Sequence, residues 1–231
     1  IGPKSETIDA MGNKINARRL MIEAEVPVIP GSKGAISDVE EALTIAEEIG
    51  YPVMLKAAAG GGGKGIRKVA DKEALPHHFA SAQQEAKAAF GNDEMYIEKI
   101  IYPARHIEVQ VLGDSFGNII HLGERDCSLQ RNNQKVLEES PSVVISESKR
   151  AELGEAAVRA AQAVGYRNAG TIEFLMADTG EFYFMEMNTR IQVEHPITEM
   201  VTNIDLVKKQ LEVASGEPLG LTQADIKMTG A

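Results

Sequence analysis

Residues 184–196 read Phe-Met-Glu-Met-Asn-Thr-Arg-Ile-Gln-Val-Glu-His-Pro, a stretch in which polar and mostly apolar side chains alternate. Successive side chains of an extended chain point to opposite faces. If the chain stays extended here, one face carries five polar residues, which are Glu186, Asn188, Arg190, Gln192 and Glu194. A solvated edge strand also alternates, but it usually draws on Lys, Thr and Ser. Two carboxylates, two amides and one Arg on a single face therefore indicate a functional strand.

A second β-rich run precedes this stretch at residues 170–176, and Asp178-Thr179-Gly180-Glu181 between the two runs reads as a hairpin turn. If Thr179-Gly180 is a two-residue loop, Asp178 faces Glu181 across the hairpin. A slip of one residue in this register would turn every side chain to the other face.

The same register places Glu173 directly opposite Glu186. Like charges that face each other across two strands destabilise a sheet, so this pair makes sense if a cation lies between them. Two carboxylates and an amide oxygen are ligands that suit Mg²⁺ or Mn²⁺. The hairpin therefore predicts a metal site formed by Glu173, Glu186 and Asn188, with Arg190 and Glu194 just beyond it.

The overall composition limits the classes of protein to be considered. The chain has 231 residues, of which 43% are hydrophobic and 25% charged, and these values are ordinary for a soluble globular protein of one or two domains. The net charge of −10 argues against general nucleic-acid binding, but it leaves room for a local cationic pocket. No apolar run reaches about 18 residues, so no membrane span is expected. The single Cys127 indicates a reducing compartment, for which we predict the cytoplasm.

Local signals predict an α+β fold in which hairpin-type links join most strands. Capping residues and apolar spacing predict helices over residues 4–24 with a break at 11–14, then over 37–49, 71–90, 146–164 and 205–214. Strands are expected over residues 51–56, 66–69, 95–98, 106–112 and 118–122, besides the hairpin. Residues 125–135 are densely polar, and their simplest interpretation is a solvated loop.

The glycine-rich segment 59–65 contains the spacing G-x-G-x-x-G, but it matches neither common nucleotide fingerprint. A dinucleotide fingerprint needs a helix directly after the loop, whereas Ile66-Arg67-Lys68-Val69 favours a strand. A Walker A loop needs Ser or Thr after Gly-Lys, and here Gly65 follows. What remains is a hairpin with Lys56 at its base, whose main-chain N–H groups could close over a phosphate. A plain flexible loop is the alternative interpretation.

Four motifs of the chain together resemble biotin carboxylase, the ATP-grasp component of the biotin-dependent carboxylases. They are Lys56 with the glycine loop, Glu124-Arg125-Asp126-Cys127-Ser128, Glu186-Met187-Asn188-Thr189-Arg190, and Gln192-Val193-Glu194-His195-Pro196. The resemblance runs over the whole chain, and the last motif is highly specific within the ATP-grasp group.

The resemblance implies an ATP-grasp fold with a small lid subdomain and a larger antiparallel-sheet catalytic subdomain. Residues 1–27 would be a helical linker, 28–100 the lid, and 101–231 the first part of the catalytic subdomain. The family's N-terminal domain would precede Ile1. Further sheet, and an Arg that stabilises the biotin enolate, would follow Ala231. We therefore expect this chain to be a central fragment that lacks both parts and that alone could be inactive.

The resemblance also implies a role for individual residues. The ATP-binding residues would be Lys14, Lys56, Gly62, Gly63, Glu98, Lys99, Ile101, His106 and Gln130. The metal ligands would be Glu173, Glu186 and Asn188, in agreement with the hairpin argument. Bicarbonate would be held by Lys135, Arg190, Gln192 and Val193. The catalytic residues would be Lys135, Arg190 and Glu194, with Glu194 as the general base. One departure from the family pattern is Asn133, where members commonly carry His. Asn keeps hydrogen-bonding groups, but unlike His it cannot be cationic, which puts a contact with ATP at this position in doubt.

The implied activity is ATP-dependent carboxylation of biotin by bicarbonate, through carboxyphosphate, with Mg²⁺ or Mn²⁺. The chain has no Met-Lys-Met segment, so biotin would arrive on a carrier protein or domain. A carboxyltransferase would be the second partner and a homodimer the expected assembly. The final acceptor, whether acetyl-CoA, propionyl-CoA, pyruvate or another acid, is not encoded in this part.

Two alternatives compete with this interpretation. One is another ATP-grasp ligase that joins a carboxylate to an amine, against which the Gln192–Pro196 motif argues. The other is a nucleotide-binding module without turnover. Bicarbonate-dependent ATP cleavage distinguishes both alternatives from a biotin carboxylase.

Overall fold

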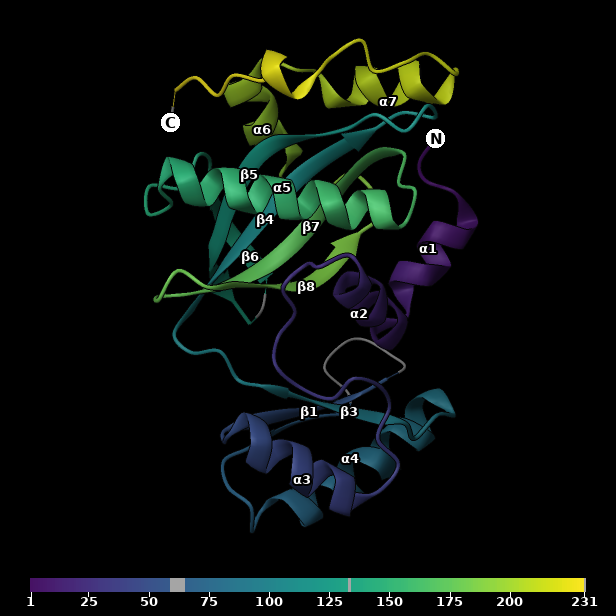
Figure 1. Ribbon diagram of the computed structural model, residues 1–231, viewed down its shortest axis with the longest axis vertical. Coiled ribbons are helices and arrows are strands. Elements are labelled where there is room, and N and C mark those ends of the chain that lie inside the picture. The colour runs from purple at the N-terminus through teal and green to yellow at the C-terminus, as the bar shows by residue number, and fades with distance from the viewer. Residues whose placement is uncertain (59–64, 133, 231) are drawn as a thin grey trace. The chain divides into compact units, whose positions relative to one another are not determined.

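The computed structural model describes residues 1–58, 65–132 and 134–230, which form an α+β fold of two compact units (Figure 1). One unit comprises residues 13–19 and 29–102, and the other comprises residues 1–12, 20–28 and 103–231. The glycine positions Gly62 and Gly63 and the departure at Asn133 lie outside the described residues. Among the helices of the described ranges, none combines the length and the apolar character needed to cross a membrane.

The unit that contains residues 29–102 is built on a three-stranded antiparallel sheet with the order β2-β1-β3. Its strands are β1 (Val53–Ala57), β2 (Ile66–Val69) and β3 (Met95–Lys99). Two helices, α3 (Val39–Ile49) and α4 (Leu75–Phe90), pack on the face where Val53 and Leu55 are fully buried. Because β1 and β2 pair with Lys56 opposite Ile66, the predicted hairpin around the glycine-rich segment is confirmed.

The predicted helix starts in this unit were slightly wrong. The side chain that caps α3 is Asp38, which accepts a hydrogen bond from the Glu41 N–H, and not Ser37. Asp71 holds a separate turn by accepting a hydrogen bond from the Ala74 N–H, so α4 begins four residues later than expected. Pro76 lies in the first turn of α4, where a missing N–H costs nothing.

The second unit is built on a five-stranded antiparallel sheet with the order β6-β5-β4-β7-β8. Its strands are β4 (Ala104–Gly113), β5 (Ile119–Arg131), β6 (Gln134–Glu139), β7 (Asn168–Ala177) and β8 (Phe182–Asn188). Its helices are α1 (Ser5–Gly12), the last four residues of α2 (Lys14–Glu23), α5 (Glu147–Ala163), α6 (His195–Thr202) and α7 (Leu206–Ala214), with a short 3₁₀ turn at Gln223–Asp225.

The two faces of this sheet differ sharply in polarity. Along β4, Ile107, Val109 and Val111 alternate with His106, Glu108 and Gln110. Helix α5 lies across the sheet (Figure 1) and covers the apolar side, where its Gly154 contacts the ring of His121, the β5 partner of Val111. The polar side is left for function, except where Thr198 of α6 contacts Arg125 and where α7 packs against Leu112.

The predicted pairing of Glu173 with Glu186 is confirmed, although the turn that produces it was wrong. Ala177 and Glu181 are bonded across a three-residue turn in which Gly180 has φ +86°, so Asp178 does not face Glu181. The longer turn shifts the register by one residue. A β-bulge that adds Met185 to β8 then restores it before Glu186.

Two further elements had been missed by the sequence analysis. The polar residues after Arg125 are not a solvated loop, because β5 continues to Arg131 and pairs with β6. The chain also stops being extended at Thr189-Arg190, where it bends, and helix α6 begins at His195. The capped helices that start after Ser146 and Asp205 match the prediction.

Close packing around Gly170 of β7 gives a test of this sheet. A Cβ at this position would lie 2.5 Å from the ring of Tyr166, which is 1% exposed and donates a hydrogen bond to the Ala169 carbonyl. The substitution Gly170→Ala should therefore lower the free energy of unfolding by about 1–3 kcal/mol. Urea denaturation measures this change.

A matched control is Gly12→Ala in α1, where an added Cβ meets open space. This variant should be as stable as the wild type or slightly more stable. Equal stability of the two alanine variants would contradict the packing described for Tyr166.

Candidate functional site

Four ionisable residues form one row across the polar face of the five-stranded sheet. In the register of the strands, Arg125 of β5 pairs with Glu108 of β4, Glu108 pairs with Glu173 of β7, and Glu173 pairs with Glu186 of β8. Residues that pair directly have Cβ atoms about 4.5–5.5 Å apart and share a face. Three carboxylates are therefore held side by side, with one guanidinium at the end of the row.

Lys135, which β6 contributes from the edge of the sheet, supplies a second cation to this row. Its Nζ lies 3.0 Å from Glu173 Oε1 and 2.7 Å from Glu194 Oε1, and it also pairs with Glu108 Oε2. All three carboxylates are at most 5% exposed, whereas the lysine side chain is 18% exposed. A single ammonium group thus joins two residues of the row to the segment after β8.

These contacts shift the pKa values of the groups involved. Burial alone would raise the pKa of Glu173, but hydrogen bonding and charge from His106 and Lys135 outweigh it and lower that pKa to about 2. Burial opposes ionisation of Glu194 as well, and the hydrogen bond from Lys135 lowers its pKa below the ordinary value. For Lys135 burial lowers the pKa, but the neighbouring carboxylates, Glu108 first, raise it above the ordinary value. The carboxylates and the ammonium therefore keep one another charged.

Several predicted site residues converge on Glu173. Its Oε1 accepts hydrogen bonds from Asn188 Nδ2 at 2.8 Å and from Gln192 Nε2 at 3.1 Å. Its Oε2 lies 2.9 Å from His106 Nε2. The other nitrogen of that ring contacts Gln130 Nε2 at 3.0 Å, so the two residues assigned to the ribose lie together.

The segment between β8 and α6 places its polar residues differently from an extended strand. Glu194 and Gln192 are buried and reach the row, as expected, but they do so from a turn. Arg190 is exposed and contacts Ile191 O at 3.2 Å and Asn188 Oδ1 at 3.5 Å. The cation beside Glu194 is Lys135 and not Arg190. Val193 is 89% exposed, which leaves its main chain as the part available to a ligand.

The sequence analysis missed two residues that organise the site. Glu108 bridges Arg125 and Lys135, and Arg125 is fully buried. The signal for Glu108 was present in the strict alternation of residues 106–111. For Arg125 it was hidden, because the residue had been placed in a loop.

Three groups of described side chains could supply ligands to a cation. In two of them, His106-Glu108-Glu173 and Glu108-Cys127-Glu194, the ligand atoms lie within 4.8 Å of one another. Both include Glu108, whose two oxygens are already paired with Arg125 and Lys135.

The third group is the predicted set of Glu173, Glu186 and Asn188. Two carboxylates on one face beside an amide are the donor chemistry that fits Mg²⁺ or Mn²⁺. Asn188 now turns its NH₂ group toward Glu173, so the amide would have to rotate to offer its oxygen to a cation.

In the other unit, Lys56 and Glu98 are joined on the sheet face that α3 and α4 do not cover. Lys56 Nζ lies 2.6 Å from Glu98 Oε2, and Arg18 Nη1 lies 3.4 Å from Glu98 Oε1. Lys99 instead donates hydrogen bonds to the carbonyls of Gly50 and Tyr51, which fixes the end of α3 beside β1. Of the other predicted ATP-binding residues, Lys14 is the first residue of α2 and Ile101 follows β3.

Cys127 is fully buried in β5, and burial raises the pKa of its thiol far above the ordinary range. The thiolate is the reactive form of cysteine, so this environment opposes a nucleophilic role.

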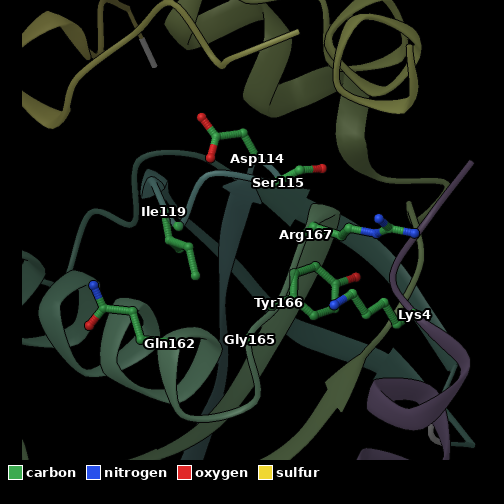
Figure 2. A pocket seen from close by; sticks show the side chains of 9 residues that line it. Lys4, Asp114, Ser115, Ile119, Gln162, Gly165, Tyr166 and Arg167 are labelled. Atoms are coloured by element: carbon green, nitrogen blue, oxygen red, sulfur yellow. The ribbon is translucent and has the colours of Figure 1, made fainter. Parts of the chain in front are cut away.

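A separate cavity of about 360 Å³ lies at the β4–β5 turn and the end of α5 (Figure 2). Its only lining carboxylate is Asp114, which accepts hydrogen bonds from the main chain of Phe116, Asn118 and Leu219. These bonds hold the turn, so the Asp114 carboxylate is committed to the fold, and the basic side chains among the lining residues are those of Lys4 and Arg167.

A family model described as "Carbamoyl-phosphate synthase L chain, ATP binding domain" matches residues 13–222. Among curated proteins, Biotin carboxylase 1 of Bacillus subtilis is 57% identical over the whole of this chain, which covers 51% of that protein. The chain therefore spans about half the length of the curated relatives it matches.

Two solved structures share the fold. A biotin carboxylase–β-γ-ATP complex from Campylobacter jejuni has a TM-score of 0.93 at 53% identity, with 99% of this chain and 51% of that chain covered. The biotin carboxylase domain dimer of the Hydrogenobacter thermophilus 2-oxoglutarate carboxylase, in complex with MgADP, ADP and bicarbonate, has a TM-score of 0.92 at 52% identity over the same shares. The predicted resemblance and the ATP-grasp fold are thereby confirmed.

Replacing Lys135 by Met tests the electrostatics of the row. The variant leaves three nearly buried carboxylates without their shared cation and should lose about 3 kcal/mol of stability at pH 7. Because the low pKa of Glu173 stabilises the wild type fully above the unfolded value of 4.5 and progressively less below it, the difference in stability between the two proteins should narrow as the pH falls from 4.5 toward 2. Urea titrations from pH 7 to pH 3 measure this.

The control is Lys87→Met, which removes an exposed pair with Asp93 and should leave the stability nearly unchanged. A loss for Lys135→Met that stays constant down to pH 3 would contradict the coupling to Glu173.

Proposed function

Because the chain belongs to the family of the carbamoyl-phosphate synthase L chain ATP-binding domain, we propose that it forms the nucleotide- and bicarbonate-binding part of a biotin carboxylase. The reaction would be the ATP-dependent carboxylation of biotin by bicarbonate, through carboxyphosphate. The observation that carries this proposal is the contact of Lys135 with Glu108, Glu173 and Glu194. It brings the predicted metal, bicarbonate and general-base residues into one cluster.

We assign the triphosphate to cationic and main-chain groups of the unit that comprises residues 13–19 and 29–102. Lys14 and Lys56 would meet the phosphates, with Gly62 and Gly63 closing over them, while Glu98, Lys99 and Ile101 would line the adenine. His106 and Gln130, which contact each other, would lie near the ribose. In the present structure Lys56 is paired with Glu98, so nucleotide binding would require this lysine to exchange a carboxylate for a phosphate.

Glu173, Glu186 and Asn188 would hold Mg²⁺ or Mn²⁺. When bound, such an ion neutralises phosphate oxygens and so lets an anionic nucleophile approach. Glu173 also keeps its partners Lys135 and Gln192 beside this position, which supports a common site for metal and bicarbonate.

Bicarbonate would lie among Lys135, Arg190, Gln192 and the main chain of Val193. The planar fork of an exposed Arg190 suits a carboxylate-like anion. Glu194, which Lys135 keeps ionised, would accept the bicarbonate proton as an oxygen attacks the γ-phosphorus and ADP leaves. The carboxyphosphate that forms would then deliver CO₂ to a biotin nitrogen.

We further propose that residues 28–100 act as the lid and residues 101–231 as the catalytic part, with residues 1–27 as the linker. Biotin would be supplied by a carrier protein or domain, and a carboxyltransferase would take up the carboxyl group. A homodimer of the full-length protein and a cytoplasmic location stay predictions of the same proposal.

The substitution Glu194→Gln tests the general base. In the full-length protein it should lower bicarbonate-dependent ATP cleavage by about 10²–10⁴-fold, because an amide cannot accept the proton. Nucleotide affinity should survive, since Glu194 is not among the residues proposed to bind ATP. The measurements are phosphate release with and without bicarbonate and calorimetric titration with nucleotide. Full bicarbonate-dependent turnover in the variant would exclude this role.

The substitution Glu186→Gln tests the metal site. It should raise the Mg²⁺ or Mn²⁺ concentration needed for half-maximal ATP cleavage, and a loss of about 10- to 100-fold in affinity is the expected range. The fold should stay intact, because the change relieves one of two like charges that face each other. Glu155→Gln, at an exposed position of α5 on the opposite side of the sheet, is the control. An unchanged metal dependence in Glu186→Gln would remove this residue from the site.

A further inference from the structure

Arg125 has the largest volume of the fully buried side chains in the described part of the chain. It lies in β5, at the end of the row of ionisable residues, with 0% of its side chain exposed. A guanidinium in this position is too deep to meet a substrate directly, so any role in the reaction must pass through its neighbours.

The guanidinium is bonded to five side chains from four other segments of the unit. Nη1 donates to Gln110 Oε1 and to Thr198 Oγ1, both at 2.8 Å, and Nε donates to Glu108. Nη2 donates to Thr171 Oγ1 at 3.3 Å and to Gln192 Oε1 at 3.2 Å. All the partner oxygens are buried, so the whole fork of donors is used inside the protein.

The bond to Gln192 fixes which way that amide points. Gln192 Oε1 accepts from Arg125, while Gln192 Nε2 donates to Glu173 Oε1 at 3.1 Å. Rotation of the amide by half a turn would bring NH₂ against the guanidinium and oxygen against the carboxylate, and both bonds would be lost. The Arg125 guanidinium on one side and the Glu173 carboxylate on the other therefore allow only one orientation of the Gln192 amide.

Arg125 also ties the helix that follows the turn, α6, to strands β4 and β7 of the sheet. Its bond to Thr198 holds α6, which begins directly after Glu194, and its bonds to Glu108, Gln110 and Thr171 hold the sheet. Within the turn, the His195 N–H donates a main-chain hydrogen bond to Gln192 O, and Glu194 pairs with Lys135.

We propose that Arg125 is a positioning residue for bicarbonate, which it serves by holding Gln192 and the turn 189–194 in the geometry that receives the anion. The inference rests on the proposed function, since it gives Gln192 a substrate to bind. It assigns to Arg125 an effect on bicarbonate affinity that is separate from any effect on the nucleotide.

A lysine cannot replace Arg125 in this role, although it keeps the charge. Its ammonium has three donors on one nitrogen, whereas five acceptors surround the planar fork of the arginine. The two longest bonds, to Thr171 and Gln192, both depend on Nη2, which lysine lacks. Arg125→Lys should therefore keep a cation beside Glu108 and release Gln192.

The matched control is Arg150→Lys on the opposite face of the sheet. Arg150 donates through Nε to both oxygens of Glu124, which is 1% exposed, and through Nη2 to two carbonyls of the chain. It is thus a second arginine–glutamate pair within the same unit, with an arginine that is 23% exposed, and among the described residues its bonds do not reach the turn 189–194. Loss of its bonds should lower the free energy of unfolding and leave the affinity for bicarbonate unchanged.

The first measurement is steady-state ATP cleavage by the full-length protein as a function of bicarbonate and of MgATP. For Arg125→Lys the bicarbonate KM should rise about 10- to 100-fold while the MgATP KM stays within about twofold. Arg150→Lys should keep both KM values. If Arg125→Lys lowered only kcat, or raised both KM values together, Arg125 would be a structural residue and the inference would be overturned.

The second measurement does not depend on the proposed reaction. Amide hydrogen exchange without substrates should be about tenfold faster over residues 189–195 in Arg125→Lys, and unchanged there in Arg150→Lys. Unchanged exchange in Arg125→Lys would overturn the positioning role whatever the kinetics show. If exchange is faster in Arg125→Lys but ATP cleavage by the wild type does not depend on bicarbonate, Arg125 still stabilises the turn. That result would reject the proposed function and overturn the assignment of Arg125 to bicarbonate binding.

Discussion

The structure of the larger unit depends on neutralising three carboxylates that the sheet holds side by side in one cross-strand row. Glu108, Glu173 and Glu186 are neighbours by register, so their distances are set by the sheet and cannot relax. Like charges at such distances are tolerable only where cations lie between or beside them. Arg125 and Lys135 supply that charge from β5 and β6, and a divalent ion at Glu173 and Glu186 would supply the rest.

This requirement explains features of the architecture that packing alone would not. The sheet must extend to β6, a strand with little buried surface, because Lys135 reaches the row from there. The opposite face must be strongly apolar, and α5 covers it with small buried alanines that allow close approach. The turn between β8 and α6 must fold back so that Gln192 and Glu194 reach the row. A site of this kind is assembled from six separate segments, namely β4, β5, β6, β7, β8 and the turn after β8, and each segment contributes only a few polar groups.

The sequence was a good guide where a local pattern decides the structure. Period-two alternation identified both strands of the Glu173–Glu186 hairpin, and capping residues identified the starts of α5 and α7. It failed where the deciding contact was distant. The three-residue turn shifts the register of the two strands by one residue, and the bulge at Met185 shifts it back. The pairing of Glu173 with Glu186 was therefore predicted correctly from a two-residue turn that the chain does not form. Arg125 resembled a loop residue because a buried polar residue in a strand is stable only with hydrogen-bond partners. The partners of Arg125 lie 15 to 73 positions away in the sequence, where no local pattern reveals them.

We propose that this cluster activates bicarbonate as a nucleophile toward ATP, and the fate of one oxygen atom tests this role most directly. If a bicarbonate oxygen attacks the γ-phosphorus and the carboxyphosphate then loses CO₂, that oxygen stays on phosphorus. The full-length protein should therefore be given ATP and bicarbonate labelled with ¹⁸O in unlabelled water, before the label exchanges with solvent, and the released phosphate analysed by mass spectrometry. The account predicts one ¹⁸O atom in each phosphate released during bicarbonate-dependent turnover. Phosphate that carries its new oxygen from water, with none from bicarbonate, would contradict it.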